Sequence, residues 1–230
     1  FVNVTKEVTD IKSASSGVFG NFDITFLVRI QNTGSDVLRN ITLEDKVSTH
    51  LGSTFIRLVP TGRPSIVSSD ATTVPSLNPS FDASLDPQIF LGTDGELARL
   101  EEILVSFTVE IDPDAPSAPD ELTNQVLVSG SDSNGNVIMD SSDSGDDPRT
   151  NNLGAPGDTG GNDDPTPVGA AGISISYQQV DILYDPNDEI GKHTVEMDIR
   201  VRNYGNVPLE DLQINNALLD QLGPAFVGFP

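Results

Sequence analysis

The chain has 230 residues, and 12 basic against 35 acidic side chains give it a formal net charge of −23. This balance excludes the clustered Lys and Arg that nucleic-acid phosphates require, so we expect no nucleic-acid partner. There is no cysteine, which excludes disulfides and thiolate metal sites. No apolar run approaches the roughly 20 residues that cross a bilayer, so we expect no membrane span.

Strand periodicity dominates the chain. Residues 22–31 alternate between apolar side chains, from Phe22 to Ile30, and polar ones, and residues 103–111 do the same. Shorter strands are expected at 2–8, 40–43, 55–59, 65–68, 88–91 and 122–129, with Pro and Gly between most of them. Only 95–102 and 215–221 allow a helical turn. The sequence predicts an all-β fold, an antiparallel β-sandwich of immunoglobulin type.

The start of the chain recurs later at a constant offset. Residues 2–56 align without a gap on residues 173–227, 171 positions later, so that Gly34 falls on Gly205 and Phe55 on Phe226. A fixed offset is typical of modular arrays, so the sandwiches are expected in tandem. We predict a sandwich repeat at 1–130, an acidic linker at 131–171, and the first part of a second, incomplete repeat at 172–230. A longer polypeptide or a neighbouring subunit is expected to complete it.

The acidic linker is a candidate calcium site. Eight carboxylates between residues 130 and 168, against one basic residue, repel one another unless cations neutralise them, and Ca²⁺ takes six to eight oxygen ligands. A calcium-ordered linker would use ligands from this segment and from a loop of the second repeat. The candidate ligands are Asp132, Asn134, Asn136, Asp140, Asp143, Asp146, Asp147, Asp163, Asp164, Asp185 and Asp188.

Two alternatives to calcium stay open. The acidic segment fits a solvated spacer, whose carboxylates keep the chain soluble. The loop with Asp185 and Asp188 fits an ordinary Pro-Asn turn, because its counterpart at 14–18 carries no acid.

Catalytic motifs are missing from the sequence. His50 and His193 are the only histidines, and neither lies in a metal or triad motif, so both are interpreted as partly buried structural residues. No nucleophile elbow or P-loop is present. The sequence predicts a protein that is not an enzyme.

Several segments together resemble the conserved-repeat domains of large bacterial surface proteins. These are Asn32-Thr33-Gly34, residues 37–45, 78–82 and 122–126, and the acidic stretches 140–148 and 162–168. The resemblance implies a secreted, tandem immunoglobulin-like repeat from an adhesin, fibre or matrix protein at the bacterial cell surface. Its partners would be neighbouring repeats or identical subunits.

A covalent bond is a further possibility. In some pilin sandwiches a lysine on the first strand and an asparagine on a late strand are linked by an isopeptide bond, assisted by a buried acid. Lys6 and Asn124 occupy such positions, and a mass lower by one ammonia would be the signature. The sequence alone gives this bond little weight, and Tyr177 at the position matching Lys6 shows that it would not recur in every repeat.

The sequence thus favours a structural repeat of an extracellular bacterial fibre or adhesin, with calcium stiffening the junction between repeats. Two other functions stay open: a module that binds carbohydrate or a cell surface, and an accessory domain of a secreted hydrolase. The absence of Trp disfavours the carbohydrate-binding module, and a catalytic domain in a longer polypeptide would favour the hydrolase.

Overall fold

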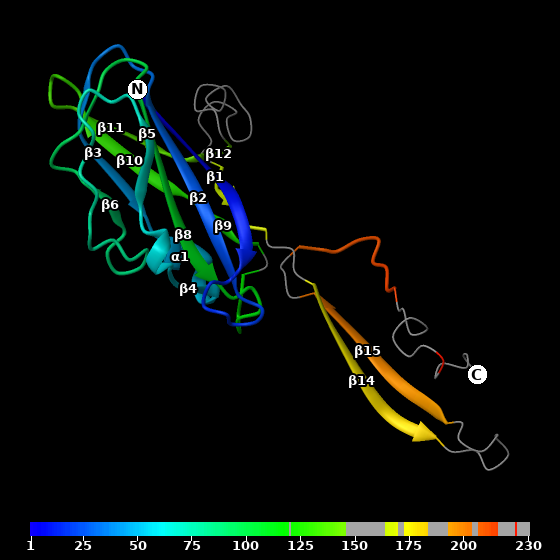
Figure 1. The fold of residues 1–230 in the computed structure, drawn as a ribbon. Helices are drawn as coiled ribbons and strands as arrows, with labels where there is room; N and C mark the ends of the chain where they lie inside the picture. The colour runs from blue at the N-terminus through cyan, green and yellow to red at the C-terminus, as the bar shows by residue number, and fades with distance from the viewer. Residues whose placement is uncertain are drawn as a thin grey trace. The chain divides into compact units, whose positions relative to one another are not determined.

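The computed structural model describes residues 1–119, 121–145, 164–169, 173–183, 193–203, 207–215 and 224. The chain divides into two compact units, Phe1–Ala170 and Ala171–Pro230. The first unit contains two packed sheets and a short two-stranded ladder, and the second contains a hairpin (Figure 1). The all-β sandwich predicted from the sequence is confirmed.

The larger sheet of the first unit has the strand order β12-β1-β2-β8-β4, and β5 also pairs with β8. Alternating apolar residues build its long strands, as predicted: Phe26 and Phe107 are buried while the positions between apolar residues are mostly half-exposed. The strands are β1 Val2–Ser13, β2 Phe22–Asn32, β4 Phe55–Leu58, β5 Ser65–Ser69, β8 Glu102–Ile111 and β12 Asp143–Ser144.

The smaller sheet has the order β11-β10-β3-β6, with β7 also paired to β3. Its strands are β3 Leu38–Asp45, β6 Gln88–Leu91, β7 Glu96–Leu97, β10 Val126–Ser131 and β11 Val137–Ser141. A third ladder joins β9 Thr123–Asn124 to β13 Thr166–Pro167.

The helical turns are not where the sequence predicted one. Residues 95–102 contain β7 and a turn in which Leu100 has φ of 70°. Because β7 pairs with β3, its backbone groups form hydrogen bonds in the sheet and are not available for a helix. Most of 215–221 lies outside the described residues. The described helices are α1 Val47–Leu51 and two 3-10 turns, η1 Gly52–Thr54 and η2 Pro60–Gly62. None of the helices in the described ranges is long and apolar enough to cross a membrane.

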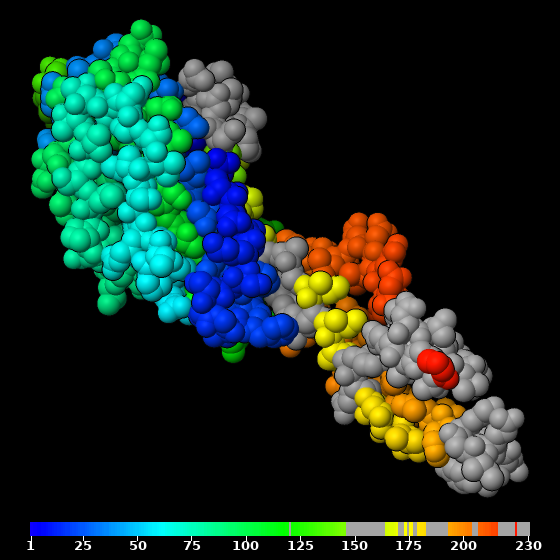
Figure 2. All heavy atoms as spheres, viewed as in Figure 1, coloured from blue at the N-terminus to red at the C-terminus, as the bar shows by residue number. Residues whose placement is uncertain are grey.

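The core lies between the two sheets. It is made of inward side chains from both sheets, with Leu51 of α1 and Phe81 of a loop closing it. The second half of β1 is more exposed than the first, and Figure 2 shows this strand (dark blue) on the surface of the first unit.

Parts of the expected linker at 131–171 belong to the first unit. Strand β11 pairs with β10, and β12 pairs in parallel with β1. After residues 146–163, which lie outside the described ranges, β13 pairs with β9. The acidic composition therefore did not mark where the sandwich ends.

The second unit repeats the first hairpin. Strands β14 Ile173–Leu183 and β15 Thr194–Asn203 pair so that Ile173 faces Asn203, as Val2 faces Asn32 in the first unit. The remaining pairs, including the register shift before Asp181, keep the same offset of 171 residues. The local pairing expected from the sequence alignment is therefore present in the structure.

Candidate functional site

Lys6 has its amine inside the sandwich. The alternation of β1 turns Val2, Val4 and Lys6 to the same side, and Lys6 has no exposed surface. Its Nζ lies 4.1 Å from the ring centre of Phe26 and 5.2 Å from that of Phe107. These rings surround the amine with apolar surface.

Asp45 faces Lys6 from the other sheet. It is the last residue of β3, where it continues the inward side of Ile41 and Leu43, and it is completely buried. Its Oδ2 lies 2.5 Å from Lys6 Nζ. Its Oδ1 is buried and has no hydrogen-bond partner among the residues that the structure describes.

Asn124 binds the same carboxyl oxygen. It lies on β9, is buried, and donates from Nδ2 to Asp45 Oδ2 at 3.3 Å. The other end of its amide, Oδ1, accepts from the backbone N–H of Gln125 at 2.9 Å and lies 2.7 Å from His50 Nδ1. One oxygen of Asp45 therefore contacts both the Lys6 amine and the Asn124 carboxamide.

Burial sets the protonation of this pair. Desolvation lowers the pKa of the Lys6 amine, although the charge of Asp45 and the hydrogen bond to it act in the opposite direction. Desolvation likewise raises the pKa of Asp45 against the effect of Lys6. Both shifts favour the neutral forms, a free amine and a carboxylic acid.

A neutral amine, a carboxamide and a shared acid are the groups that form an amide cross-link. The sequence pointed to Lys6 and Asn124, and the structure brings them together. It did not point to Asp45, which is one of 35 acidic residues and follows a strand expected to end at Leu43. The alternation of the strand could have indicated it, because Ile41, Leu43 and Asp45 are two residues apart and share one face of β3.

The end of the first unit covers this site. The backbone oxygen of Lys6 accepts from Gly145 N at 3.0 Å and from Thr166 Oγ1 at 2.8 Å. Thr166 pairs with Asn124 in the β13–β9 ladder, and Val168 N donates to Leu122 O at 2.7 Å. Thr166 and Val168 are buried. We call residues 164–168 the covering segment.

His50 differs from the interpretation as a partly buried structural residue. It is exposed on α1, which lies against β9, and it contacts the carboxamide of Asn124. The position follows from β3, since the chain turns directly from Asp45 into α1. His193 is exposed just before β15.

The described candidate calcium ligands serve different local roles. The carboxylate of Asp132 accepts from the backbone of Asn134 and Asn136 and from the Asn136 side chain, which closes the turn between β10 and β11. Hydrogen bonds from Asn136 hold the pKa of Asp132 below its usual range. Asp140 accepts from Val4 N at 2.8 Å.

The remaining candidates are only partly within the described residues. Buried Asp143 on β12 accepts from Asp164 N at 3.4 Å. Asp146, Asp147, Asp163, Asp185 and Asp188 lie outside the described residues. Within the described ranges, no three His, Cys, Asp or Glu residues gather in a metal-binding group. Calcium binding stays a prediction.

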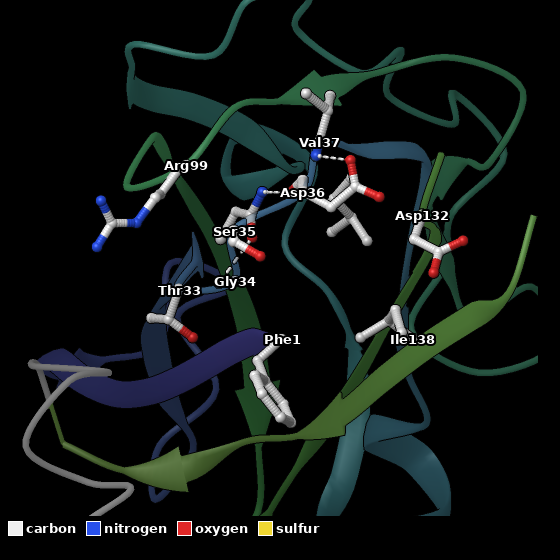
Figure 3. A pocket seen from close by; sticks show the side chains of 11 residues that line it. Phe1, Thr33, Gly34, Ser35, Asp36, Val37, Arg99, Asp132 and Ile138 are labelled. Carbon is white, nitrogen blue, oxygen red and sulfur yellow. Dashed lines mark hydrogen bonds between the residues drawn. The ribbon is translucent and has the colours of Figure 1, made fainter. Parts of the chain in front are cut away.

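A separate open pocket of about 500 Å³ lies beside the turn that follows β2. Figure 3 shows Arg99 and Asp132 on opposite sides of it, with Phe1 at its rim. The carboxylate of Asp36, which also lines this pocket, accepts hydrogen bonds from Val37 N and from Ser133. The residues of the Lys6 site do not line this pocket.

No protein-family model matches the chain, and no curated protein matches it. Solved structures resemble it at low identity. The major pilin subunit BcpA of Bacillus cereus has 10% identity and a TM-score of 0.35, over 90% of this chain and 56% of the pilin. The full-length major pilin SpaD of Corynebacterium diphtheriae has 12% and 0.36, over 76% and 42%. The GH20 exo-β-N-acetylglucosaminidase of Vibrio harveyi has 12% and 0.32, over 63% and 18%. The chain thus spans 56% of the BcpA pilin and less than half of each of the other two structures.

Proposed function

We propose that this chain is a non-enzymatic structural module of an extracellular bacterial fibre or adhesin, and that its first unit locks itself with an isopeptide bond between Lys6 and Asn124. The observation that carries the proposal is that Lys6 Nζ and Asn124 Nδ2 both bind Asp45 Oδ2 in the buried core.

The bond forms by exchange of one amine for another. Lys6 Nζ, as the free amine, attacks Cγ of Asn124, and a tetrahedral intermediate forms. Asp45, as the carboxylic acid, donates its proton to Nδ2, which leaves as ammonia, and the resulting carboxylate takes a proton from the attacking nitrogen. The products are a secondary amide and ammonia, so no oxidant or cofactor is required.

The apolar surroundings favour this reaction. An amine attacks only when it is deprotonated, and burial lowers the pKa of Lys6. Phe26 and Phe107 exclude water from one side, and the covering segment lies over the backbone of Lys6 and Asn124. Water is thereby kept from competing with the amine for Cγ.

The bond would suit a protein that bears tension. Lys6 lies on β1 of the larger sheet, and Asn124 lies two residues before the start of β10 in the smaller sheet. A bond between them closes a covalent loop around most of the sandwich. Force applied on either side of this loop then passes through the bond, and the strands between are not pulled apart.

Calcium is the second part of the proposal. The negative charge of the acidic segment supports it, since cations relieve repulsion between neighbouring carboxylates. Bound Ca²⁺ would stiffen the junction with the next repeat.

Intact-mass spectrometry of the purified 230-residue chain tests the bond. We expect a mass one ammonia below that of the sequence, and a branched peptide joining Lys6 to Asn124 after proteolysis. Lys6→Met should restore the full mass. Lys12→Met is the matched control, because Lys12 lies on the same strand but is exposed, and it should retain the loss of ammonia. A folded wild-type chain of full mass would overturn the proposal.

A further inference from the structure

We infer that His50, together with the backbone N–H of Gln125, stabilises the oxyanion that forms on Asn124 during the cross-link reaction, which makes His50 a catalytic residue of this site. The inference rests on the proposed isopeptide bond and goes beyond it, because it assigns a role to an exposed histidine outside the Lys, Asp and Asn set.

The nitrogen and the oxygen of the Asn124 carboxamide have different partners. Nδ2, the leaving nitrogen, binds Asp45 Oδ2. Oδ1, on the opposite end, lies 2.7 Å from His50 Nδ1 and 2.9 Å from Gln125 N. Asp45 therefore handles protons on the nitrogen side, and the other two groups act only on the oxygen.

The distance to His50 fixes which atom carries the hydrogen. The amide oxygen can only accept, so a nitrogen 2.7 Å away must present an N–H. Nδ1 of His50 is then a donor and has no lone pair for the Gln125 N–H, which lies 3.4 Å from it. That N–H is left to Asn124 Oδ1, and the oxygen receives two donors.

Two donors on one carbonyl oxygen are the arrangement that favours acyl transfer. Attack by Lys6 turns the neutral oxygen into an oxyanion, and hydrogen bonds to it strengthen as the charge develops. Both donors are held in place before the reaction. Gln125 belongs to the same backbone as Asn124, and α1 holds His50 against β9.

The second repeat offers an independent observation. At the constant offset of 171, Lys6 corresponds to Tyr177, Asp45 to Asn216 and His50 to Gln221. The repeat without the nucleophile thus also lacks the acid and the histidine. This joint replacement is what a shared role of the three residues predicts.

The rate of bond formation tests the inference. The 230-residue chain is made by cell-free translation, samples are quenched in acid at successive times, and intact mass gives the fraction that has lost ammonia. His50→Ala should slow this loss about ten- to a hundred-fold, toward the lower side of the effect of an oxyanion donor, because His50 is exposed. His50→Gln, which keeps an N–H donor, should restore part of the rate.

Two further measurements separate catalysis from folding. His193→Ala, in the other unit, should react at the wild-type rate. In the Lys6→Met background, where no bond forms, His50→Ala should leave the thermal midpoint nearly unchanged. If His50→Ala reacts as fast as wild type, the inference is overturned and the bond stands. If the wild-type chain never loses ammonia, the proposed bond itself is overturned, and the role of His50 with it.

Discussion

Lys6 Nζ lies 2.5 Å from Asp45 Oδ2, and both side chains are completely buried. As an ion pair this contact would be a poor source of stability, because desolvation of two charges offsets most of their attraction. The Asp45 Oδ1 atom, which is buried and has no hydrogen-bond partner within the described ranges, adds to that cost. The pair is better explained by reactivity, since an amine held neutral beside an acid and an amide is prepared for acyl transfer.

Removal of the acid should slow formation of the cross-link. In Asp45→Ala, no group takes the proton from Lys6 or returns one to the leaving nitrogen, so bond formation should slow by about 10²–10⁴-fold. Glu44→Gln is the matched control, because Glu44 is the preceding residue of β3 and lies outside the Lys6 site. Intact mass after equal times measures both. Complete loss of ammonia in Asp45→Ala would refute the role of Asp45.

The bond should contribute measurably to stability. A cross-link from residue 6 to residue 124 closes a loop of about 120 residues, and the loop-entropy relation for such a loop gives about 4–5 kcal/mol. Lys6→Met, which places an apolar chain in the apolar site, should therefore unfold at a lower urea concentration than wild type. Equal urea midpoints for the two chains would show that the bond is absent or without effect.

Acid should weaken the first unit through Glu110. Burial of this carboxylate acts to raise its pKa, but hydrogen bonds from Ser16, Asn21 and Arg57 outweigh it, so the folded-state pKa lies below the usual 4.5. A depressed carboxylate pKa contributes stability that is present above the unfolded value and lost as pH falls through the folded value. Glu110→Gln should cost about 1–3 kcal/mol at neutral pH.

Thermal unfolding across a pH series checks this sign. The difference between wild type and Glu110→Gln should shrink as pH falls below 4.5, because only the wild-type residue titrates there. A difference that stays constant through this range would contradict the assignment. Glu121→Gln, at an exposed residue, serves as the control.

The long strands could be predicted because the alternation of apolar and polar residues in the sequence shows which side chains are buried. The alternation from Phe22 to Ile30 defines one inward face, and the 171-residue offset located the matching β15. Asp45 was missed because a charged residue is expected at the surface, and only tertiary packing shows that it completes an inward face. The same holds for His50, whose role depends on a contact with a strand 74 residues away.

The acidic segment could not be divided correctly from composition. Asp, Gly and Ser favour turns and spacers, which led to a linker spanning 131–171. Long-range pairing overrides this tendency at β12 and β13, which gain backbone hydrogen bonds from β1 and β9, while β11 forms a hairpin with the preceding strand β10. Local composition carries no information about such partners.

Calcium removal tests the second part of the proposed function. With Ca²⁺ bound, chelation should lower the thermal midpoint and speed proteolysis between Asp132 and Asp164, because the carboxylates there would again repel. Mg²⁺ at equal concentration is the control, since it prefers to keep its own waters. Unchanged melting and cleavage with and without chelator would leave the solvated spacer as the better interpretation.

Val168 provides a test of the covering segment. Although it follows the acidic stretch, its side chain is only 1% exposed and packs in the core of the first unit. Val168→Ala should therefore cost about 1–3 kcal/mol of unfolding free energy. Val137→Ala is the matched control, because Val137 is 63% exposed within the same expected linker and should change little. If the two substitutions have equal effects on the urea midpoint, the covering segment does not pack on the sandwich, and the site around Lys6 is open to water.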